Sequence, residues 1–205
     1  MAAIQQNKVV FLKMIFSDIL NGSKVLLRCI EKSDCNENYK KWMNDPDISV
    51  YLEARWHKQD IPDLLDFVRS VRKSPSDYQF AIIEKSSGLH VGNIKLGGIH
   101  HIYKRGDIGY FIGEKNCWGK GYAKEAVSLV TEFGFMTLKL HRIEAGCREN
   151  NIGSQKVLEQ NGYKKEAVFR DRSFVWNDTE YVNDFFYGQL ITDYREHLIN
   201  KIKPE

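Results

Sequence analysis

The stretch CWGKGYAKEA, residues 117–126, places two glycines one residue apart just before a segment with helical periodicity. Glycine lets a backbone take a positive φ or approach a ligand closely, and the first turn of a helix carries N–H groups without intrahelical partners. Gly119, Gly121 and Ala123 have no side chain beyond a methyl group, and Lys120 adds positive charge beside them. The stretch is therefore either a tight strand-to-helix turn or a cradle for an anionic group such as a diphosphate.

Two better-known phosphate motifs do not fit the spacing around these glycines. A P-loop has four residues between its first glycine and a Gly-Lys pair, which Ser or Thr follows. Here five residues separate Gly113 from Gly119, and Gly121 follows Lys120. A dinucleotide-binding GxGxxG motif would need glycine where Lys124 stands. Neither nucleotide-binding fold is supported.

The composition indicates an ordinary globular protein of one domain. Of the 205 residues, 42% are hydrophobic and 28% are charged, a balance that excludes a disordered chain. The net charge of +3 is small and no long basic block occurs, so we expect no nucleic-acid partner. The four cysteines are scattered without a CxxC pair, which predicts no metal site and fits a reducing cytoplasm. No apolar run approaches the ~20 residues that span a membrane, so we expect no membrane partner.

The order of predicted elements is strand, two helices, three strands, helix, strand, helix and two strands, without a repeat or a linker. The pattern predicts strands at 25–30, 78–85, 89–99, 107–113, 142–147, 167–176 and 180–190, and helices at 36–43, 61–72, 121–138 and 150–162. We therefore expect one α+β domain with a mostly antiparallel, seven-stranded mixed sheet and about four flanking helices. Residues 1–20 are assigned to an N-terminal extension, 21–194 to the domain and 195–205 to a C-terminal tail.

A second segment, NNIGSQKVLEQNGY at residues 150–163, gives the glycine stretch a context. It places Asn151 and Ser154 three residues apart at a helix start and ends on Gly162, where a left-handed stop belongs. The pair of segments resembles the GNAT superfamily of acetyl-CoA-dependent N-acetyltransferases, most closely its RimJ/RimL-like branch. IGYFIGEKNCWGKGYAKEA looks like the coenzyme A loop of that branch, and the second segment matches its N-x-x-S-x-x-V-L-E-x-x-G-aromatic motif. The resemblance covers about residues 23–194.

The resemblance implies a GNAT fold whose fourth and fifth strands, DIGYFI and RIEAGC, splay apart to admit the pantetheine arm of acetyl-CoA. Backbone groups of the fourth strand would bind that arm, and backbone N–H groups of the glycine loop would hold the pyrophosphate. Many relatives open this loop with Arg or Gln, whereas Trp118 stands here. The cofactor residues expected from the resemblance are Phe111, Ile112, Gly119, Lys120, Gly121, Tyr122, Ala123 and Asn151, and no metal is expected.

The reaction that the resemblance implies is direct transfer of an acetyl group from a thioester to an amine. A backbone N–H near Ile112 would stabilise the oxyanion. Many superfamily members protonate the departing thiolate with a tyrosine, but the matching position here is Leu158. A serine has been given the role in this branch, and Ser154 occupies its place. The alternative is that Ser154 only satisfies the helix start.

The acceptor side is expected in the stretch VYLEARWHKQD, residues 50–60. Glu53 is our first candidate for the base that takes the amine proton, and the alternative is a surface carboxylate paired with Arg55. His100 or His101 is the second candidate, and only one of them can face inward because adjacent strand residues face opposite sides. The aromatic rings expected to stack on the acceptor are Tyr51 and Trp56, and His100 is the third expected substrate-binding residue.

The favoured acceptor is a small amine, an amino sugar or nucleotide-linked amino sugar, because NDPDISVYLEARW looks like the opening of surface-sugar acetyltransferases. A peptide N-terminus or an amine antibiotic is the alternative acceptor. A different class of function, a coenzyme A-binding module without turnover, stays open because no tyrosine stands at position 158. A homodimer is compatible with the sequence, which does not set the oligomeric state.

Overall fold

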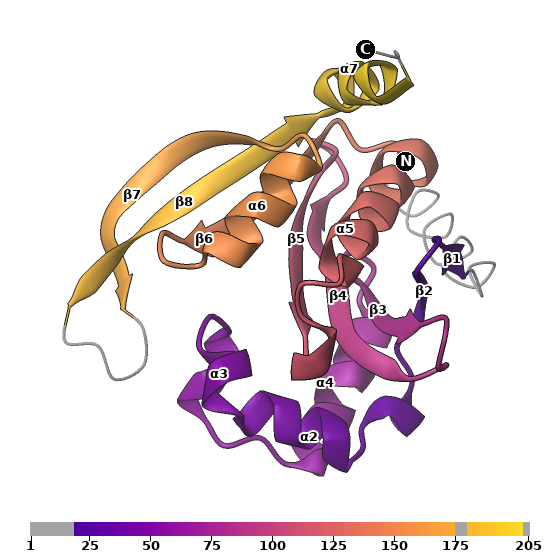
Figure 1. Ribbon diagram of the computed structural model, residues 1–205, viewed down its shortest axis with the longest axis vertical. Coiled ribbons are helices and arrows are strands. Elements are labelled where there is room, and N and C mark those ends of the chain that lie inside the picture. Colours follow the sequence, from indigo (N-terminus) through magenta and orange to yellow (C-terminus); the bar gives the residue numbers. More distant parts are fainter. Residues whose placement is uncertain (1–18, 175–179, 203–205) are drawn as a thin grey trace.

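The computed structural model describes residues 19–174 and 180–202, and its core is one mixed sheet (Figure 1). The described residues form eight strands in the order β1-β2-β3-β4-β5-β6-β8-β7. All neighbouring strands are antiparallel except β5 and β6, which are parallel. The strands are β1 Leu20–Asn21, β2 Val25–Cys29, β3 Tyr78–Glu84, β4 His90–His100, β5 Arg105–Ile112, β6 Arg142–Arg148, β7 Lys164–Phe174 and β8 Tyr181–Leu190.

Six α-helices accompany this sheet in the described part of the chain. They are α2 Glu37–Asn44, α3 Pro46–Ser49, α4 Ile61–Lys73, α5 Tyr122–Glu132, α6 Ile152–Gln160 and α7 Ile191–Ile202, and the short helices η1 Lys32–Asp34, η2 Glu53–Trp56, η3 Lys115–Cys117 and η4 Phe133–Thr137 lie between them. Helices α5 and α6 lie next to each other, whereas α2, α3 and α4 gather at the other end of the molecule from α7 (Figure 1). None of these helices is long and apolar enough to cross a membrane.

Two hydrophobic clusters occupy opposite faces of the sheet, and β5 contributes to both. Tyr110 and Ile112 pack against the larger cluster, which includes the apolar face of α5. Phe111 packs against the smaller cluster, which α2 and α4 supply with residues such as Trp42 and Leu64. This division follows from the alternation of side chains along a strand.

The structure confirms the α+β architecture with a mostly antiparallel mixed sheet expected from the sequence, with three additions. The sheet has one strand more than predicted, because the two-residue β1 pairs with β2. The four-residue helix α3 was not predicted. Helix α7 was not predicted either, and it begins inside the expected domain and continues into the segment assigned as a tail. Of the expected extension over residues 1–20, residues 1–18 lie outside the described residues, whereas Leu20 belongs to β1. Residues 175–179, between the last two strands, also lie outside the described residues.

The parallel strands β5 and β6 pair over only three residues and then diverge. Their register joins Arg105 to Arg142, Gly106 to Ile143 and Asp107 to Glu144. Beyond these pairs β5 continues to pair with β4, and β6 continues to pair with β8. The facing edges of β5 and β6 are therefore left without a strand partner.

Glu125, on α5, ties the start of this helix to the β1–β2 turn. Its carboxylate accepts hydrogen bonds from Ser23 N (2.8 Å) and Oγ (2.6 Å), Lys24 N (2.8 Å) and Val25 N (2.7 Å). Burial alone would raise the pKa of Glu125, but these hydrogen bonds outweigh burial and hold it below its usual value. The turn passes so close that a Cβ on Gly22 would lie 2.6 Å from Glu125 Cδ.

We expect Glu125→Gln to destabilise the fold by about 1–3 kcal/mol at pH 7, because an amide leaves backbone donors unsatisfied. The lowered pKa means that the charged carboxylate contributes its full stability above the free glutamate value of about 4.3. This contribution disappears as the pH falls through the lower folded-state pKa. Urea unfolding of the wild type and the variant between pH 3 and 8 measures the difference, which should shrink at the acid end. Glu132→Gln, an exposed position on the same helix, is the control; a difference that grows toward acid would contradict the assignment.

Candidate active site

The glycine loop before α5 adopts the left-handed conformation that its sequence suggested. Gly119 has φ +75° and Gly121 has φ +85°, and Gly121 is the residue that precedes the first turn of α5. A Cβ on Gly119 would meet no atom within 4 Å, so backbone conformation and not space requires glycine there. The N–H groups of the first turn of α5, which follow this loop, have no intrahelical partners.

Hydrogen bonds connect the loop to the end of β5 and to the β1–β2 turn. The Trp118 indole Nε1 donates to Ile112 O at 2.9 Å, and the Lys24 ammonium donates to Lys120 O at 2.9 Å. The Tyr122 side chain is buried and its hydroxyl donates to Glu84, a hydrogen bond that with burial raises its pKa to about 12. The Tyr122 ring also lies beside the loop, with Lys120 Nζ 5.9 Å from its centroid.

Three further contacts connect the segment before the loop to α2 and α3. Lys115 forms ion pairs with Asp45 (2.8 Å), which caps α3, and with Asp47 (2.7 Å), which lies in its first turn. Trp42, on α2, donates from its indole to Glu114 Oε1 at 3.1 Å. The segment before the glycine loop is thus joined directly to α2 and α3, which precede the predicted acceptor stretch of residues 50–60.

The backbone of β5 presents Ile112 to the divergent edge. Gly113 N donates to Val91 O on the β4 side at 2.8 Å. Because backbone groups alternate in direction along a strand, the N–H and C=O of Ile112 and Tyr110 point away from β4. Phe111 has the opposite orientation, and its ring lies against Tyr39 and Trp42. Of the two expected cofactor residues on β5, Ile112 faces the diverging edge and Phe111 does not.

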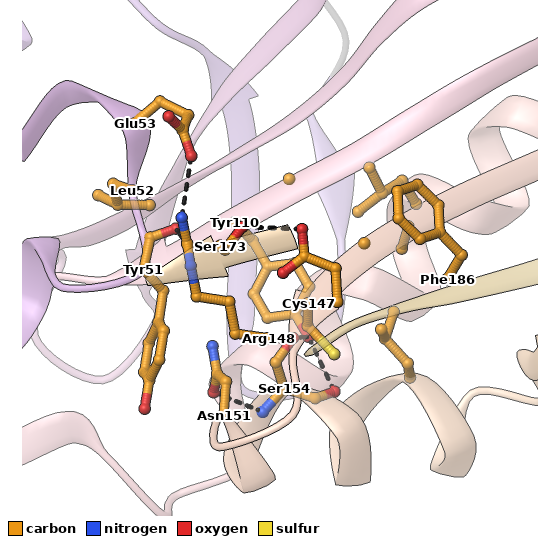
Figure 2. Close-up of a pocket in the computed structure, with 16 residues that line it drawn as sticks. Tyr51, Leu52, Glu53, Tyr110, Cys147, Arg148, Asn151, Ser154, Ser173 and Phe186 are labelled. Carbon is orange, nitrogen blue, oxygen red and sulfur yellow. Dashed lines mark hydrogen bonds and ion pairs between the residues drawn. The ribbon is translucent and has the colours of Figure 1, made fainter. Parts of the chain in front are cut away.

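A cavity of about 240 Å³ lies where β5 and β6 diverge (Figure 2). Its walls come from five segments that are distant in the sequence. They are residues 51–53, residues 108–110 of β5, residues 145–148 of β6, Asn151, Ser154 and Leu158 around α6, and Ser173, Asp184 and Phe186 of the β7–β8 hairpin.

One wall of the cavity is a cluster of hydroxyl and thiol groups. The Tyr110 hydroxyl lies 2.9 Å from Ser154 Oγ, and Ser154 N donates to Asn151 Oδ1 at 3.1 Å (Figure 2). Asn151 therefore caps α6, and Ser154 occupies the helix start while its hydroxyl bonds to Tyr110. Burial raises the pKa of Tyr110, and it raises the pKa of the neighbouring Cys147 thiol to about 11. All of these hydroxyl and thiol groups are neutral at physiological pH.

The opposite wall is organised by the buried Arg148. Its guanidinium donates to Tyr51 O at 2.9 Å and to Glu53 Oε1 at 3.0 Å (Figure 2). The Glu53 side chain is 80% exposed and also accepts from Trp56 Nε1 at 3.3 Å. The carboxylate is therefore paired with Arg148, and the alternative pairing with Arg55 is wrong. Arg55 donates instead to the carbonyl oxygens of residues 50 and 174.

Asp184, on β8, lines the same wall. Its side chain is 16% exposed, and its Oδ2 accepts from Ser173 Oγ at 2.9 Å and lies 3.5 Å from Arg172 Nε. Its Oδ1 is buried and has no hydrogen-bond partner among the residues that the structure describes. A buried carboxylate oxygen without a donor is unfavourable, so this atom is suited to accept a hydrogen bond from a ligand.

The structure does not bring every expected residue to the cavity. His100 Nδ1 accepts from Tyr103 N at 3.2 Å and its ring stacks on Tyr103, and His101 is exposed in the following turn. Neither histidine lines the cavity. Trp56 lies outside the lining residues and packs against Phe174, with ring centroids 5.2 Å apart. Tyr51 lines the cavity, as expected.

Several lining side chains were not expected from the sequence as site residues, among them Tyr110, Arg148 and Asp184. The alternation of β5 could have indicated that Tyr110 faces the same side as the apolar Ile108 and Ile112. Arg148 and Asp184 carried no such local signal, because their neighbours come from distant segments. In the described ranges no group of three or more His, Cys, Asp or Glu side chains could hold a metal ion.

Comparison with known proteins places this geometry in a family. The sequence profile described as "Acetyltransferase (GNAT) domain" matches residues 24–164. The "Uncharacterized N-acetyltransferase p20" of Bacillus licheniformis is 30% identical over 156 residues, covering 75% of this chain and 86% of that protein. The "Probable N-acetyltransferase YjcK" of Bacillus subtilis is 31% identical over 173 residues, covering 78% and 93%. The chain belongs to the GNAT acetyltransferase family.

Solved structures share the fold. A GNAT-family acetyltransferase from Bacillus anthracis superposes with a TM-score of 0.72 at 25% identity, covering 84% of this chain and 98% of that one. The spermidine N-acetyltransferase from Vibrio cholerae, solved with CoA and spermine, gives 0.76 at 19% identity with coverages of 85% and 99%. RimL, a ribosomal L7/L12 α-N-protein acetyltransferase solved with coenzyme A, gives 0.75 at 16% with 86% and 99%. The protein is an acyltransferase of the N-acetyltransferase class.

Proposed function

We propose that the protein transfers an acetyl group from acetyl-CoA directly to a primary amine. The observation that carries the proposal is the divergence of β5 and β6, which leaves a cavity between a hydroxyl-lined wall and a carboxylate-lined wall. Acetyl-CoA supplies the activated acetyl group as a thioester. Relatives with this fold were solved with coenzyme A, which supports the same donor here.

The residues that would hold the donor act mainly through their backbones. The N–H groups of residues 119–123 would bind the pyrophosphate at the start of α5, where the helix dipole favours negative charge. The backbone of Ile112 would bind the pantetheine arm, and Trp118 would stay attached to the Ile112 carbonyl. Asn151 would contact the donor while it caps α6. Direct transfer then needs one group to take a proton from the ammonium and another to give one to the thiolate.

Proton balance assigns a role to each wall of the cavity. The acceptor nitrogen loses two protons as it changes from an ammonium to an amide. One goes to a carboxylate on the acceptor wall and then to solvent, which frees the lone pair for attack on the thioester carbon. The other balances the proton that the departing sulfur takes up when the C–S bond breaks. Ser154 Oγ is the hydroxyl that would donate to that sulfur, as the sequence suggested.

Two carboxylates are candidates for the base, and the geometry favours Asp184 over Glu53. Glu53 already binds Arg148 and Trp56, so accepting a proton would disrupt that ion pair. The Asp184 side chain is 16% exposed, and its buried Oδ1 has no donor among the described residues. An incoming ammonium would satisfy that oxygen before giving it a proton.

The charges around the cavity bear on the acceptor. Glu53 and Asp184 are accompanied by Arg148, Arg55 and Arg172, so the acceptor wall is of mixed charge. A polyamine would need several carboxylates along its length, whereas one amine beside neutral or anionic groups fits this mixture. A nucleotide-linked amino sugar and a peptide α-amino group are both such acceptors. Two of the solved structures with this fold are named for spermidine and for ribosomal protein L7/L12, so they lend no support to the amino sugar.

The decisive experiment measures release of free thiol from acetyl-CoA with a panel of amines. The panel contains glucosamine, UDP-linked glucosamine, a peptide with a free N-terminal serine, spermidine and kanamycin. We expect thiol release matched by amide formation, faster with a single-amine acceptor than with spermidine or kanamycin. Tight CoA binding by calorimetry without thiol release from any amine would instead support the coenzyme A-binding module without turnover.

We expect Gly119→Ala to raise KM for acetyl-CoA about tenfold. A side chain at a positive φ costs about 1–2 kcal/mol, and relaxation of the loop would move N–H groups away from the pyrophosphate. Gly88→Ala is a matched control, because Gly88 has φ +72° and its added Cβ would also meet nothing within 4 Å. Both variants should lose similar stability in thermal melts, but only Gly119→Ala should affect KM. Equal KM values in the two variants would contradict the pyrophosphate cradle.

We expect Asp184→Asn to lower kcat/KM by about 100-fold or more and to remove the acidic limb of its pH profile, because the base works only when deprotonated. Glu53→Gln should lower kcat/KM less and keep the limb. Asp193→Asn is the matched control: the Asp193 side chain is also 16% exposed, but it lies in the first turn of α7 and pairs with Lys164. The reverse order of effects, with the limb lost in Glu53→Gln, would assign the base to Glu53.

A further inference from the structure

Tyr110 and Ser154 form the closest pair of hydroxyl groups on the cavity wall. The Tyr110 hydroxyl lies 2.9 Å from Ser154 Oγ and also donates to Ser154 O at 3.3 Å. The two residues come from β5 and α6, 44 positions apart in the sequence, and both line the cavity (Figure 2). This distance is that of an ordinary O–H···O hydrogen bond, so a proton can move between the two oxygens.

The pair stands next to Leu158, the position where many superfamily members carry a tyrosine. Leu158 is fully buried and offers no proton. The phenol of Tyr110 comes to the same cavity from the neighbouring strand. The chain therefore has a phenol available in the cavity without a tyrosine on α6.

The fold holds the Tyr110 hydroxyl in one arrangement. Tyr110 packs against the larger hydrophobic cluster, and the start of α6 is fixed because Asn151 Oδ1 accepts from Ser154 N. Burial raises the pKa of Tyr110, so the phenol keeps its proton through the physiological range. A neutral, buried phenol is a proton donor and a poor base.

We propose that Tyr110 is a positioning residue of the acetyl transfer, which orients Ser154 and restores its proton as the thiolate leaves. The proposal rests on the proposed function, since it concerns the same reaction. It also accounts for a serine in the acid role, because an isolated serine hydroxyl would be left as an unstable alkoxide after donating.

The protons balance along this relay. The C–S bonding pair goes to sulfur as the tetrahedral adduct collapses, and sulfur takes the proton of Ser154 Oγ. The Ser154 O–H bond re-forms with the proton of Tyr110, whose phenolate is then reprotonated by water. The second proton leaving the amide nitrogen passes to solvent, so the site returns to its starting state without an oxidant or a further reactant.

Tyr110→Phe tests the relay in the full chain, with acetyl-CoA and the fastest amine of the panel. We expect kcat to fall about 100-fold, the range of a positioned proton donor, while Kd for CoA by calorimetry stays within threefold. Tyr163→Phe is the matched control, because the Tyr163 hydroxyl lies 2.8 Å from Thr131 Oγ1, is buried and does not line the cavity. It should lower the melting temperature and leave kcat unchanged.

Two readouts separate a relay from a structural contact. In the Tyr110→Phe/Ser154→Ala double variant, kcat should be close to that of Ser154→Ala alone, because both changes interrupt one path. Replacement of Tyr110 by 3-fluorotyrosine, which keeps the shape and makes the phenol more acidic, should move the alkaline limb of kcat to lower pH. The 3-fluorotyrosine variant also tests the relay if Tyr110→Phe folds poorly.

The relay is overturned if Tyr110→Phe lowers kcat no more than Tyr163→Phe, or if the losses of the two single variants multiply in the double variant. It is also overturned if 3-fluorotyrosine leaves the alkaline limb in place. If the wild-type protein releases thiol and one of these results is obtained, the relay is wrong but the proposed function stands. A wild-type protein that releases no thiol with any amine would overturn both.

Discussion

The termination of β5–β6 pairing after three residue pairs is the constraint on which the rest of the site depends. Two strand edges that separate inside a sheet expose backbone groups that must find other partners. Trp118 takes one carbonyl of β5, and Arg148 at the end of β6 gathers the segment that carries Tyr51 and Glu53. The cavity lies beside this separation, with residues of both strands in its lining.

The parts of the site that could be predicted from sequence are those determined by neighbouring residues. A left-handed backbone requires glycine, so Gly119 and Gly121 mark the loop regardless of what surrounds it. Asn151 caps a helix three residues before Ser154, and this spacing is local too. The alternation and helical periods set most strands and helices, and the two-residue β1 was too short to give either signal.

The remaining contacts of the site join residues that are far apart in the sequence, so they could not be predicted from any single segment. The sequence places Glu53 near Arg55, but the fold brings Arg148 to the carboxylate from 95 positions away. Nothing in the sequence distinguishes Asp184 from other acidic residues of a hairpin, and it reaches the cavity only because β8 pairs with β6. The imidazole of His100 could serve as a base, but the sequence around it does not indicate that β4 ends away from the cavity.

The bridge from Lys115 to Asp45 and Asp47 has a consequence for how such an enzyme can diversify. Helices α2 and α3 would be the natural segments to exchange when a new acceptor is sought, yet the start of α3 is electrostatically coupled to the donor loop. If these helices were exchanged without keeping Asp45, Asp47 and Trp42, the segment before the glycine loop would lose its contacts with them. Engineering acceptor preference in this chain therefore requires that the contacts of Lys115 and Glu114 with α2 and α3 be kept while the pocket is reshaped.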